Sequence, residues 1–205
     1  MNYVDRYGID LNFFHNLVAI DGPAKKAVFE VKEPEKDVRQ VEVEFDMIHV
    51  TPPQTAPDFI RVSPLADAAG WVDVDQSTLR HKTYDNIWSL GDVMNAPNAK
   101  TAAARKQAPV VAENIVSDIS GHSATVQYDG YGSCPLTVER GKIVLAEFGY
   151  GGTLLPSFPR WLVDGTKPTR TAWLLKERIL PPVYWRAILR GKEWMAKPEK
   201  VSAAR

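Results

Sequence analysis

The residue best suited to take part in a chemical reaction is Cys134, the single cysteine of the 205-residue chain. It lies in the segment 128–136 (YDGYGSCPL), where two glycines, two tyrosines and a proline predict a rigid, turn-rich loop. Structural cysteines usually lie in apolar helices or strands, whereas reactive ones need a lowered pKa or a redox partner. The sequence places no histidine or pair of basic residues beside Cys134. The local sequence therefore leaves a structural and a reactive role open.

A second candidate site begins at Gly91 and Asp92, in the segment 87–93 (IWSLGDV), which is typical of a buried strand that ends in a glycine turn. Glycine lets the backbone approach a ligand closely, and a carboxylate just beyond a strand can accept a hydrogen bond from a sugar-type hydroxyl. A helix is predicted from about Thr101, because the alanines that follow have high helix propensity. Its first N–H groups, together with Lys100, would favour negative charge on a bound group. Gly-Asp alone is more typical of an ordinary turn with a solvated carboxylate.

The composition limits the class of protein. Hydrophobic residues make up 44% of the chain and charged residues 24%, as in globular proteins. The 25 basic and 25 acidic side chains cancel, so no overall field favours nucleic acid. The four histidines are dispersed and lack metal-ligand spacing with Cys134, which predicts no metal site. Because we find no long apolar stretch and no basic start followed by an apolar run, we expect neither a transmembrane helix nor a signal peptide.

The spacing of apolar residues predicts the elements that must position these groups. Residues 14–45 alternate apolar and polar side chains and are interpreted as an antiparallel β-meander. A helix should run from Thr101 to about Ser117, with a local kink at Pro109. Further strands are expected at residues 47–50, 71–75, 86–92, 125–128 and 142–146. The fold class is therefore expected to be α/β or α+β.

The C-terminal part of the chain contains two amphipathic segments, residues 173–180 and 183–190, separated by Pro181 and Pro182. Aromatic and aliphatic residues share faces with Arg and Lys, and each segment is expected to form a helix of about ten residues. This composition is typical of segments that lie in a membrane interface. It is also compatible with a helical hairpin packed on a core, whose basic side chains snorkel to water.

Several segments together resemble one family. They are TPP at 51–53, ADAAGWVDVD at 66–75, GD at 91–92, KTAAA at 100–104, SCPL at 133–136, KIVLAEF at 142–148 and VYWR to LRG at 183–191. In this order they are similar to sulfide:quinone oxidoreductases, particularly the branch that includes the mitochondrial enzyme, over roughly residues 8–192. The Gly-Asp segment with its helix also resembles the second flavin-binding motif of flavoproteins with two dinucleotide-binding domains. The ordered series is far more specific than any one motif.

The resemblance implies a partial flavoprotein of this two-dinucleotide-binding-domain class in three parts. Residues 1–46 would be a remnant of the NAD(P)-binding-like domain with the β-meander, 47–120 the C-terminal part of the FAD-binding domain, and 121–205 the redox-cysteine, quinone and membrane-contact region. In this family the aspartate, here Asp92 beside Gly91, binds the ribityl chain of FAD. The start of the helix faces the pyrimidine edge of the flavin, which implies cofactor-binding roles for Lys100, Thr101, Ala102 and Ala103.

The resemblance also implies a reaction. Sulfide attacks a disulfide or a sulfur-bridged cysteine pair beside the flavin, one cysteine keeps the transferred sulfur as a persulfide, and FAD passes two electrons to a quinone. Cys134 matches the C-terminal member of this pair, and Phe148 and Tyr150 are the candidate quinone-binding residues. The partner cysteine and the glycine-rich pyrophosphate fingerprint do not occur in these residues. We therefore expect a C-terminal fragment that is inactive alone.

The expected substrates are sulfide and quinone, and the expected cofactor is FAD. We further expect a peripheral membrane contact through the C-terminal segment, a cytoplasmic location at the inner membrane, and self-association through unpaired strand edges. Two alternatives stay open. One is a fragment of a type II NADH:quinone oxidoreductase-like flavoprotein, in which Cys134 is incidental. The other is a non-catalytic interaction module.

Overall fold

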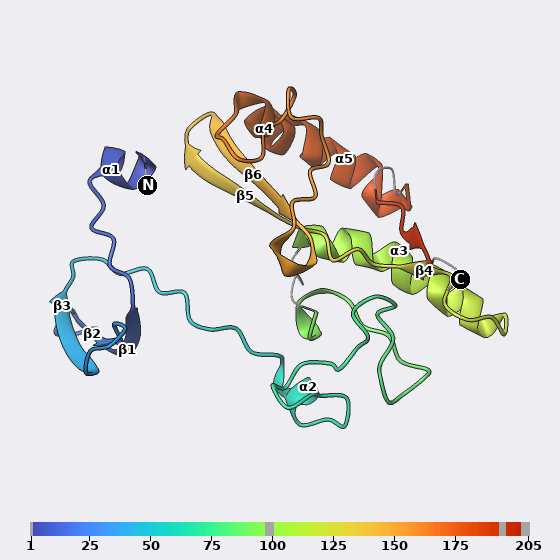
Figure 1. Ribbon diagram of the computed structural model, residues 1–205, viewed down its shortest axis with the longest axis horizontal. Helices are drawn as coiled ribbons and strands as arrows, with labels where there is room; N and C mark the ends of the chain where they lie inside the picture. The colour runs from blue at the N-terminus through green and yellow to red at the C-terminus, as the bar shows by residue number, and fades with distance from the viewer. Residues whose placement is uncertain (1, 97–100, 193–195, 202–205) are drawn as a thin grey trace. The chain divides into compact units, whose positions relative to one another are not determined.

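The computed structural model of the chain describes residues 2–96, 101–192 and 196–201. The chain forms two compact units, which are described separately and are called the N-terminal unit (Met1–Pro53) and the C-terminal unit (Gln54–Arg205) (Figure 1). All the site residues predicted from the sequence belong to the C-terminal unit. Residues 54–120 and 121–205 are parts of that same unit.

The N-terminal unit is a small antiparallel sheet preceded by a short helix. Its elements are α1 (Asn2–Tyr7), β1 (His15–Asp21), β2 (Lys26–Val31) and β3 (Arg39–Glu44). The strands pair in the order β1-β2-β3, with β2 in the centre, and this confirms the predicted meander. Ala27 and Val31 of β2 are buried, because the central strand is the one covered by side chains from both neighbours. The strand predicted at residues 47–50 is wrong: these residues form bends and loop, and Met47 is 89% exposed.

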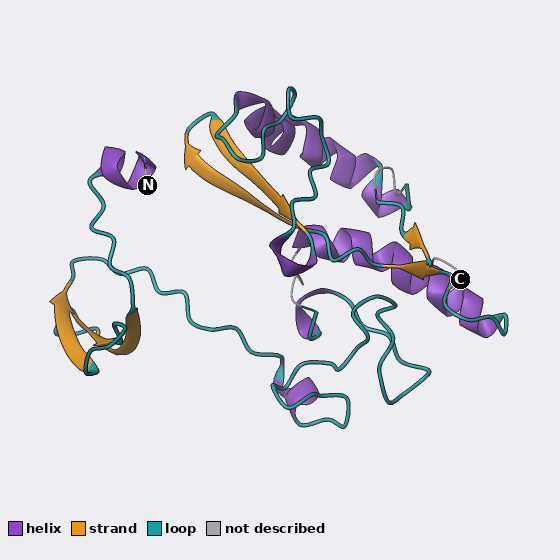
Figure 2. Cartoon of the chain, viewed as in Figure 1, coloured by secondary structure: helices purple, strands orange, loops and turns teal. Residues whose placement is uncertain are grey.

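Residues 54–96, here called the bridged loop, start the C-terminal unit and contain little regular structure (Figure 2). They include only two short helices among the described elements, α2 (Asp58–Arg61) and the 3-10 turn η1 (Gly91–Val93). The strands predicted at 71–75 and 86–92 are wrong, because these segments pair only at isolated bridges. The bridges join Val72 to Met94, Val74 to His81, and Arg80 to Trp88.

Side chains replace the missing strand ladder in the bridged loop. The Asn95 Oδ1 atom accepts a hydrogen bond from the N–H group of Val74 at 3.3 Å, and its Nδ2 atom donates to Asp73 Oδ1 at 2.7 Å. Lys82 adds a second contact to the same Asp73 oxygen at 2.6 Å. A buried backbone N–H group needs a partner, and here an amide side chain supplies it where a neighbouring strand would otherwise do so.

Helix α3 (Thr101–Ile119) is the longest element of the C-terminal unit. It begins where the sequence predicted, and it continues through Pro109 to end two residues beyond the predicted Ser117. Among the α3 side chains that the structure describes, the buried ones follow helical spacing and are Ala103, Gln107, Val110, Asn114 and Ser117. Three of these five side chains are polar, which is unusual for a core-facing stripe.

The core of the unit lies between α3, the bridged loop and the short strand β4 (Val126–Gln127), which pairs with β7 (Glu199–Lys200). Its buried residues are Ala56, Ile60, Val72, Val74, Leu79, Met94, Ala96, Ala103, Val110, Val126 and Tyr128. Seven of them come from the bridged loop, which is therefore anchored by burial of its apolar side chains. The predicted strand at 125–128 is confirmed in position, although it is shorter than expected.

The strands β5 (Gly132–Glu139) and β6 (Lys142–Phe148) form an antiparallel hairpin, seen as a separate two-stranded ribbon in Figure 1. The strand predicted at 142–146 is confirmed by β6. The loop predicted around Cys134 is wrong, because Cys134 lies in β5 opposite Ala146. Gly132, which suggested a turn, instead pairs with Phe148, the last residue of β6. The ladder therefore reaches the end of the hairpin.

The C-terminal segment forms one continuous helical run. It consists of α4 (Arg170–Leu174), the π-helical segment η3 (Leu175–Ile179) and α5 (Leu180–Arg186), followed by the 3-10 turn η4 (Ile188–Arg190). The predicted break at Pro181 and Pro182 is wrong, because both prolines lie in the first turn of α5, where a helix tolerates the missing N–H group. Ala172 of α4 packs with Ile143, Leu145 and Val163 in a second small core. The mixture of helices and antiparallel strands confirms the predicted mixed α/β class.

Candidate functional site

The Gly91–Asp92 turn has a backbone conformation that requires glycine. Gly91 has φ = 76°, a left-handed value that side chains other than glycine adopt at a cost. A Cβ atom at this position would meet no heavy atom within 4 Å, so the requirement comes from the backbone and not from crowding. Asp92 is exposed and makes no hydrogen bond or ion pair within the described part of the chain. The turn therefore presents a carboxylate that is available to a ligand.

Helix α3 holds this turn through one buried side chain. The N–H group of Gly91 donates a hydrogen bond to Gln107 Oε1 at 2.8 Å. Gln107 is 0% exposed, and Ala103, one helical turn earlier on the same face, is 0% exposed as well. The second turn of α3, which contains Gln107, therefore lies beside Gly91. Lys100 lies outside the described residues, and of Thr101 and Ala102 only the helical backbone is described.

Gln107 is not among the site residues predicted from the sequence. Its only signal is a polar side chain at helical spacing between the apolar positions Ala103 and Val110. A glutamine in a predicted helix is ordinarily interpreted as exposed, because glutamine is a mostly exposed residue type. Its partner Gly91 lies sixteen residues earlier in the chain, and no local pattern connects the two.

Cys134 and Phe148 share one face of the β5–β6 hairpin. Cys134 is opposite Ala146, and Phe148 is opposite Gly132, two residues along each strand. Side chains two residues apart on a strand point to the same side, and diagonal neighbours on an antiparallel pair lie roughly 7–8 Å apart. The two residues opposite them, Ala146 and Gly132, carry only a methyl group and a hydrogen atom. The structure therefore brings the predicted redox cysteine and one predicted quinone-binding residue together.

The other face of the hairpin is buried and carries a hydrogen-bonded acid. Glu147 is 6% exposed, and its carboxylate accepts hydrogen bonds from the Tyr131 hydroxyl at 2.6 Å and from the Ser157 N–H group at 3.1 Å. Burial, together with the hydrogen bond to Glu147, raises the pKa of Tyr131 to about 12, so this hydroxyl stays a donor at neutral pH. The Lys106 ammonium lies 4.5 Å from the centre of the Tyr131 ring and pairs with Asp129 at 3.1 Å.

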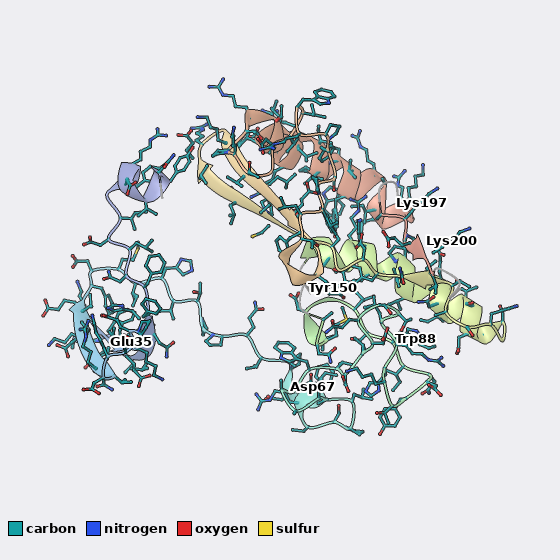
Figure 3. All side chains as sticks on the ribbon, viewed as in Figure 1. Glu35, Asp67, Trp88, Tyr150, Lys197 and Lys200 are labelled. Atoms are coloured by element: carbon teal, nitrogen blue, oxygen red, sulfur yellow. The ribbon has the colours of Figure 1, made fainter. Side chains whose placement is uncertain are left out.

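Tyr150 does not share the face of Cys134 and Phe148. The hydroxyl of Tyr150, which is labelled in Figure 3, donates to the backbone oxygen of Gln76 at 2.7 Å. Its ring packs edge-on against Tyr128. A Cβ atom at Gly130 would come within 2.4 Å of the Tyr150 ring, so the ring lies directly on that glycine. Burial raises the pKa of Tyr150 to about 12. The structure gives this residue a packing role, and its predicted quinone contact stays a prediction.

Helix α3 is the element common to both halves of the site, since it contacts both η1 and β5. Gly91 and Asp92 thus lie next to α3, and the strand that contains Cys134 packs on the same helix. Within residues 2–96, 101–192 and 196–201, no three metal-ligating side chains gather into a group. No helix of that described part is long and apolar enough to cross a bilayer.

Comparison with known proteins identifies the class. The chain is similar over about nine-tenths of its length to curated sulfide:quinone oxidoreductases, which confirms the predicted resemblance. The mitochondrial sulfide:quinone oxidoreductase of Dictyostelium discoideum is 44% identical over 192 residues, which is 93% of this chain and 40% of the relative. The proteins of the same name from Mus musculus and Schizosaccharomyces pombe are 39% and 38% identical, over 89% and 91% of this chain.

The chain spans only about 40% of the length of each of these relatives. No protein-family model matches it. Among solved structures, a chain in the cryo-EM structure of the mitochondrial ATP synthase of Tetrahymena thermophila has a TM-score of 0.64 and 23% sequence identity. That likeness covers 94% of this chain and 42% of the other, and at this identity it concerns the fold alone.

Proposed function

We propose that the chain supplies the Asp92 turn of the flavin site and the redox residue Cys134 of an FAD-dependent sulfide:quinone oxidoreductase. The observation that carries the proposal is the geometry around α3. This helix binds the Gly91–Asp92 turn through buried Gln107 and packs against the strand that contains Cys134. One element therefore relates the predicted cofactor-binding turn to the predicted thiol.

The residues present fit an FAD. Asp92 is an exposed carboxylate without a partner in the described structure, and it is the proposed acceptor for a ribityl hydroxyl. Gly91 leaves open space on its Cβ side, so a flat ligand can approach the backbone there. The proposed neighbours of the flavin ring are the first residues of α3, Lys100, Thr101, Ala102 and Ala103, because a helix N-terminus favours negative charge. When bound, FAD would supply a two-electron acceptor that can in turn reduce a quinone.

The proposed role of Cys134 is thiol–disulfide chemistry. Hydrosulfide would attack a disulfide formed by Cys134 and a second cysteine from residues outside this chain. One sulfur–sulfur bond breaks and one forms, which leaves a persulfide on one cysteine and a thiolate on the other. Transfer of the outer persulfide sulfur to a thiolate acceptor would leave two cysteine thiolates, and their return to the disulfide would release two electrons. A bound FAD would supply the acceptor for these electrons and the route to the quinone, which takes up two protons when it is reduced. Phe148, on the same face as Cys134, is the proposed contact for the quinone ring, and Tyr150 is the second candidate.

The C-terminal helical run is the proposed membrane contact, because a quinone is lipid-soluble. Its exposed apolar residues include Leu174, Ile179, Leu180, Tyr184, Trp185 and Leu189. Basic side chains alternate with them, which favours an interface with anionic lipids. We propose peripheral attachment to the inner membrane from the cytoplasmic side; the curated relatives are named as mitochondrial proteins. Self-association through the unpaired edges of β1 and β3 belongs to the same proposal.

Vesicle sedimentation tests the membrane contact. Replacing Trp185 and Leu189 together with Glu should release the chain from vesicles of phosphatidylcholine and phosphatidylglycerol. The matched control replaces Val116 and Ile119, which are 65% and 81% exposed on α3, with Glu. Equal loss of vesicle binding in both double variants would show that general hydrophobicity accounts for the binding. Unchanged binding in both would contradict the C-terminal contact.

The proposed reaction is tested in a hybrid protein in which the chain replaces the corresponding 40% of the Dictyostelium relative. Sulfide should bleach the flavin of the hybrid, and Cys134→Ser should abolish the bleaching while leaving the flavin bound. Thr137→Ser, in the same strand, is the control and should retain it. Bleaching that survives Cys134→Ser would contradict the redox role of Cys134, and bleaching by NADH in its place would favour an NADH:quinone oxidoreductase.

A further inference from the structure

The buried face of α3 contains two amides whose hydrogen bonds differ in an informative way. Gln107 and Asn114 lie seven residues apart on the same face and are 0% and 2% exposed. Asn114 donates to the backbone oxygens of Thr78 and Val126, and its Oδ1 atom accepts from the N–H groups of Thr125 and Val126. Asn114 therefore satisfies both ends of its amide with backbone and has an architectural role.

Gln107 satisfies only one end of its amide. Its Oε1 atom accepts the Gly91 N–H group at 2.8 Å, whereas its Nε2 atom makes no hydrogen bond in the described structure. The Gln107 side chain lies near the Tyr128 hydroxyl, which itself donates to the backbone oxygen of Tyr131. Burial raises the pKa of Tyr128 and the Gln107 amide partly offsets this, so the Tyr128 hydroxyl stays protonated.

A buried, half-satisfied amide is costly, and a leucine at the same place in the helix would pack without that cost. The one group that a leucine would leave without a partner is the N–H group of Gly91. This group belongs to the Leu90–Gly91 peptide, at the start of the turn in which Gly91 has φ = 76°. Holding that peptide against α3 fixes where the turn begins, and the Asp92 carboxylate leaves the turn one residue later.

We propose that Gln107 is a positioning residue for the flavin site: it holds the Gly91–Asp92 turn against α3 so that the Asp92 carboxylate faces the ribityl chain of FAD. This inference rests on the proposed flavin site and adds to it a buried residue that does not touch the cofactor. Gln107 acts through Asp92, and its effect should therefore be seen both in the free turn and in cofactor affinity.

The first experiment needs no ligand. Hydrogen exchange of the Gly91 amide is measured by NMR in the purified chain and in Gln107→Met, which keeps the length of the side chain without an acceptor. We expect the Gly91 amide to exchange roughly tenfold faster in this variant, the factor that the loss of one hydrogen bond implies. Gln107→Glu, which keeps an acceptor oxygen, should restore most of the protection. An unchanged Gly91 amide in Gln107→Met would overturn the proposal.

The second experiment titrates FAD against the same proteins and follows quenching of flavin fluorescence. Gln107→Met should weaken FAD binding about tenfold or more, with partial rescue by Gln107→Glu. Asn114→Met is the matched control: it should lower the stability of the chain but leave the affinity of the folded fraction for FAD unchanged. If the wild-type chain binds FAD and Gln107→Met binds it equally well, the positioning role fails while the flavin site stands. If the wild-type chain binds no FAD, the flavin site fails, and the Gly91 exchange rates still decide whether Gln107 holds the turn.

Discussion

The bridged loop and the β5–β6 hairpin hold their chemical groups in opposite ways. In the bridged loop, the Gly91–Asp92 turn is fixed by a single side chain, Gln107, and by apolar burial of its neighbours. In the hairpin, Cys134 is fixed by the backbone ladder, which runs without a break from Gly132 to Thr137. The turn therefore depends on the identity of a few buried side chains, whereas the position of Cys134 depends on strand pairing.

This difference predicts how the two regions respond to substitution. A backbone ladder is nearly independent of side-chain identity, so a residue in it can be replaced with little structural effect. A loop held by buried amides responds differently. Removing one amide loses a hydrogen bond and also leaves its former partner buried and unsatisfied. Substitutions in and around the bridged loop should therefore cost stability, and comparable substitutions in the hairpin should cost mainly chemistry.

The largest effect is expected for Asn114→Leu. This change leaves four backbone groups of residues 78, 125 and 126 without their amide partner. The free energy of unfolding should fall by about 3 kcal/mol, since each unsatisfied buried group costs about 1–3 kcal/mol and some find water. Urea unfolding followed by tryptophan fluorescence measures the change. The neighbouring Glu113→Leu, on the exposed side of α3, should alter it by less than about 0.5 kcal/mol; equal effects would remove the special role of the buried face.

A smaller effect is expected for Asp73→Asn, and it should depend on pH. The Lys82 ammonium and the Asn95 amide hold the pKa of Asp73 below its ordinary value, Lys82 being the larger cause. A depressed pKa means that the carboxylate stabilises the fold above its unfolded pKa of about 3.9 and that this contribution is lost as pH falls through the folded value. At neutral pH the variant should be about 1.5 kcal/mol less stable.

The measurement is thermal unfolding of both proteins between neutral pH and about pH 3. The difference in melting temperature should be constant down to about pH 5 and should shrink as the pH falls below about 4. A difference that stays constant to pH 3 would show that the Asp73 charge does not contribute, and that the amide of Asn95 alone secures this part of the bridged loop.

The next effect concerns two glycines with the same backbone conformation. Gly91 and Gly121 both have φ = 76°, and neither would place a Cβ atom within 4 Å of another group. Replacing either with Ala should cost about 1 kcal/mol through backbone strain alone, as urea unfolding can measure. FAD affinity should fall only for Gly91→Ala, because Gly121 follows the C-terminal end of α3. Equal loss of affinity in both variants would contradict a specific role for the Gly91 turn.

The smallest effect on stability is expected for Cys134→Ser. The thiol is partly exposed, and the ladder that positions it is made by the backbone. The free energy of unfolding should change by less than about 0.5 kcal/mol, in contrast to Asn114→Leu. A loss of 2 kcal/mol or more would make Cys134 a packing residue and would weaken the case for its redox role.

The accuracy of the sequence predictions follows the same division. The meander and α3 were predicted well, because alternation and an alanine-rich run are local signals that survive in the fold. The strands expected at 71–75 and 86–92 failed because apolar runs there bury their side chains without forming a ladder, and Asn95 replaces the partner strand at Val74. Gln107 could not have been predicted, since its role depends on the approach of Gly91, which is distant in the sequence.

The surroundings of Cys134 show the converse error. Its glycines and tyrosines suggested a loop, yet Gly132 pairs within the ladder and Tyr131 is held by Glu147. Turn-forming residues were interpreted by type, while the partner strand β6 that decides their conformation lies further along the chain. The motif resemblance nevertheless identified Cys134, Gly91 and Asp92 as candidate site residues, because an ordered series of motifs carries information that local propensity does not.

The most direct test of the flavin site is an equilibrium titration of the purified chain with FAD, comparing wild type with Asp92→Asn and with Asp85→Asn. Asp85 is an exposed carboxylate in the same bridged loop and serves as the charge-matched control. The proposed site predicts measurable binding by the wild-type chain, an affinity about tenfold lower for Asp92→Asn, and an unchanged affinity for Asp85→Asn. Absence of FAD binding by the wild-type chain, or equal affinities in all three proteins, would contradict it.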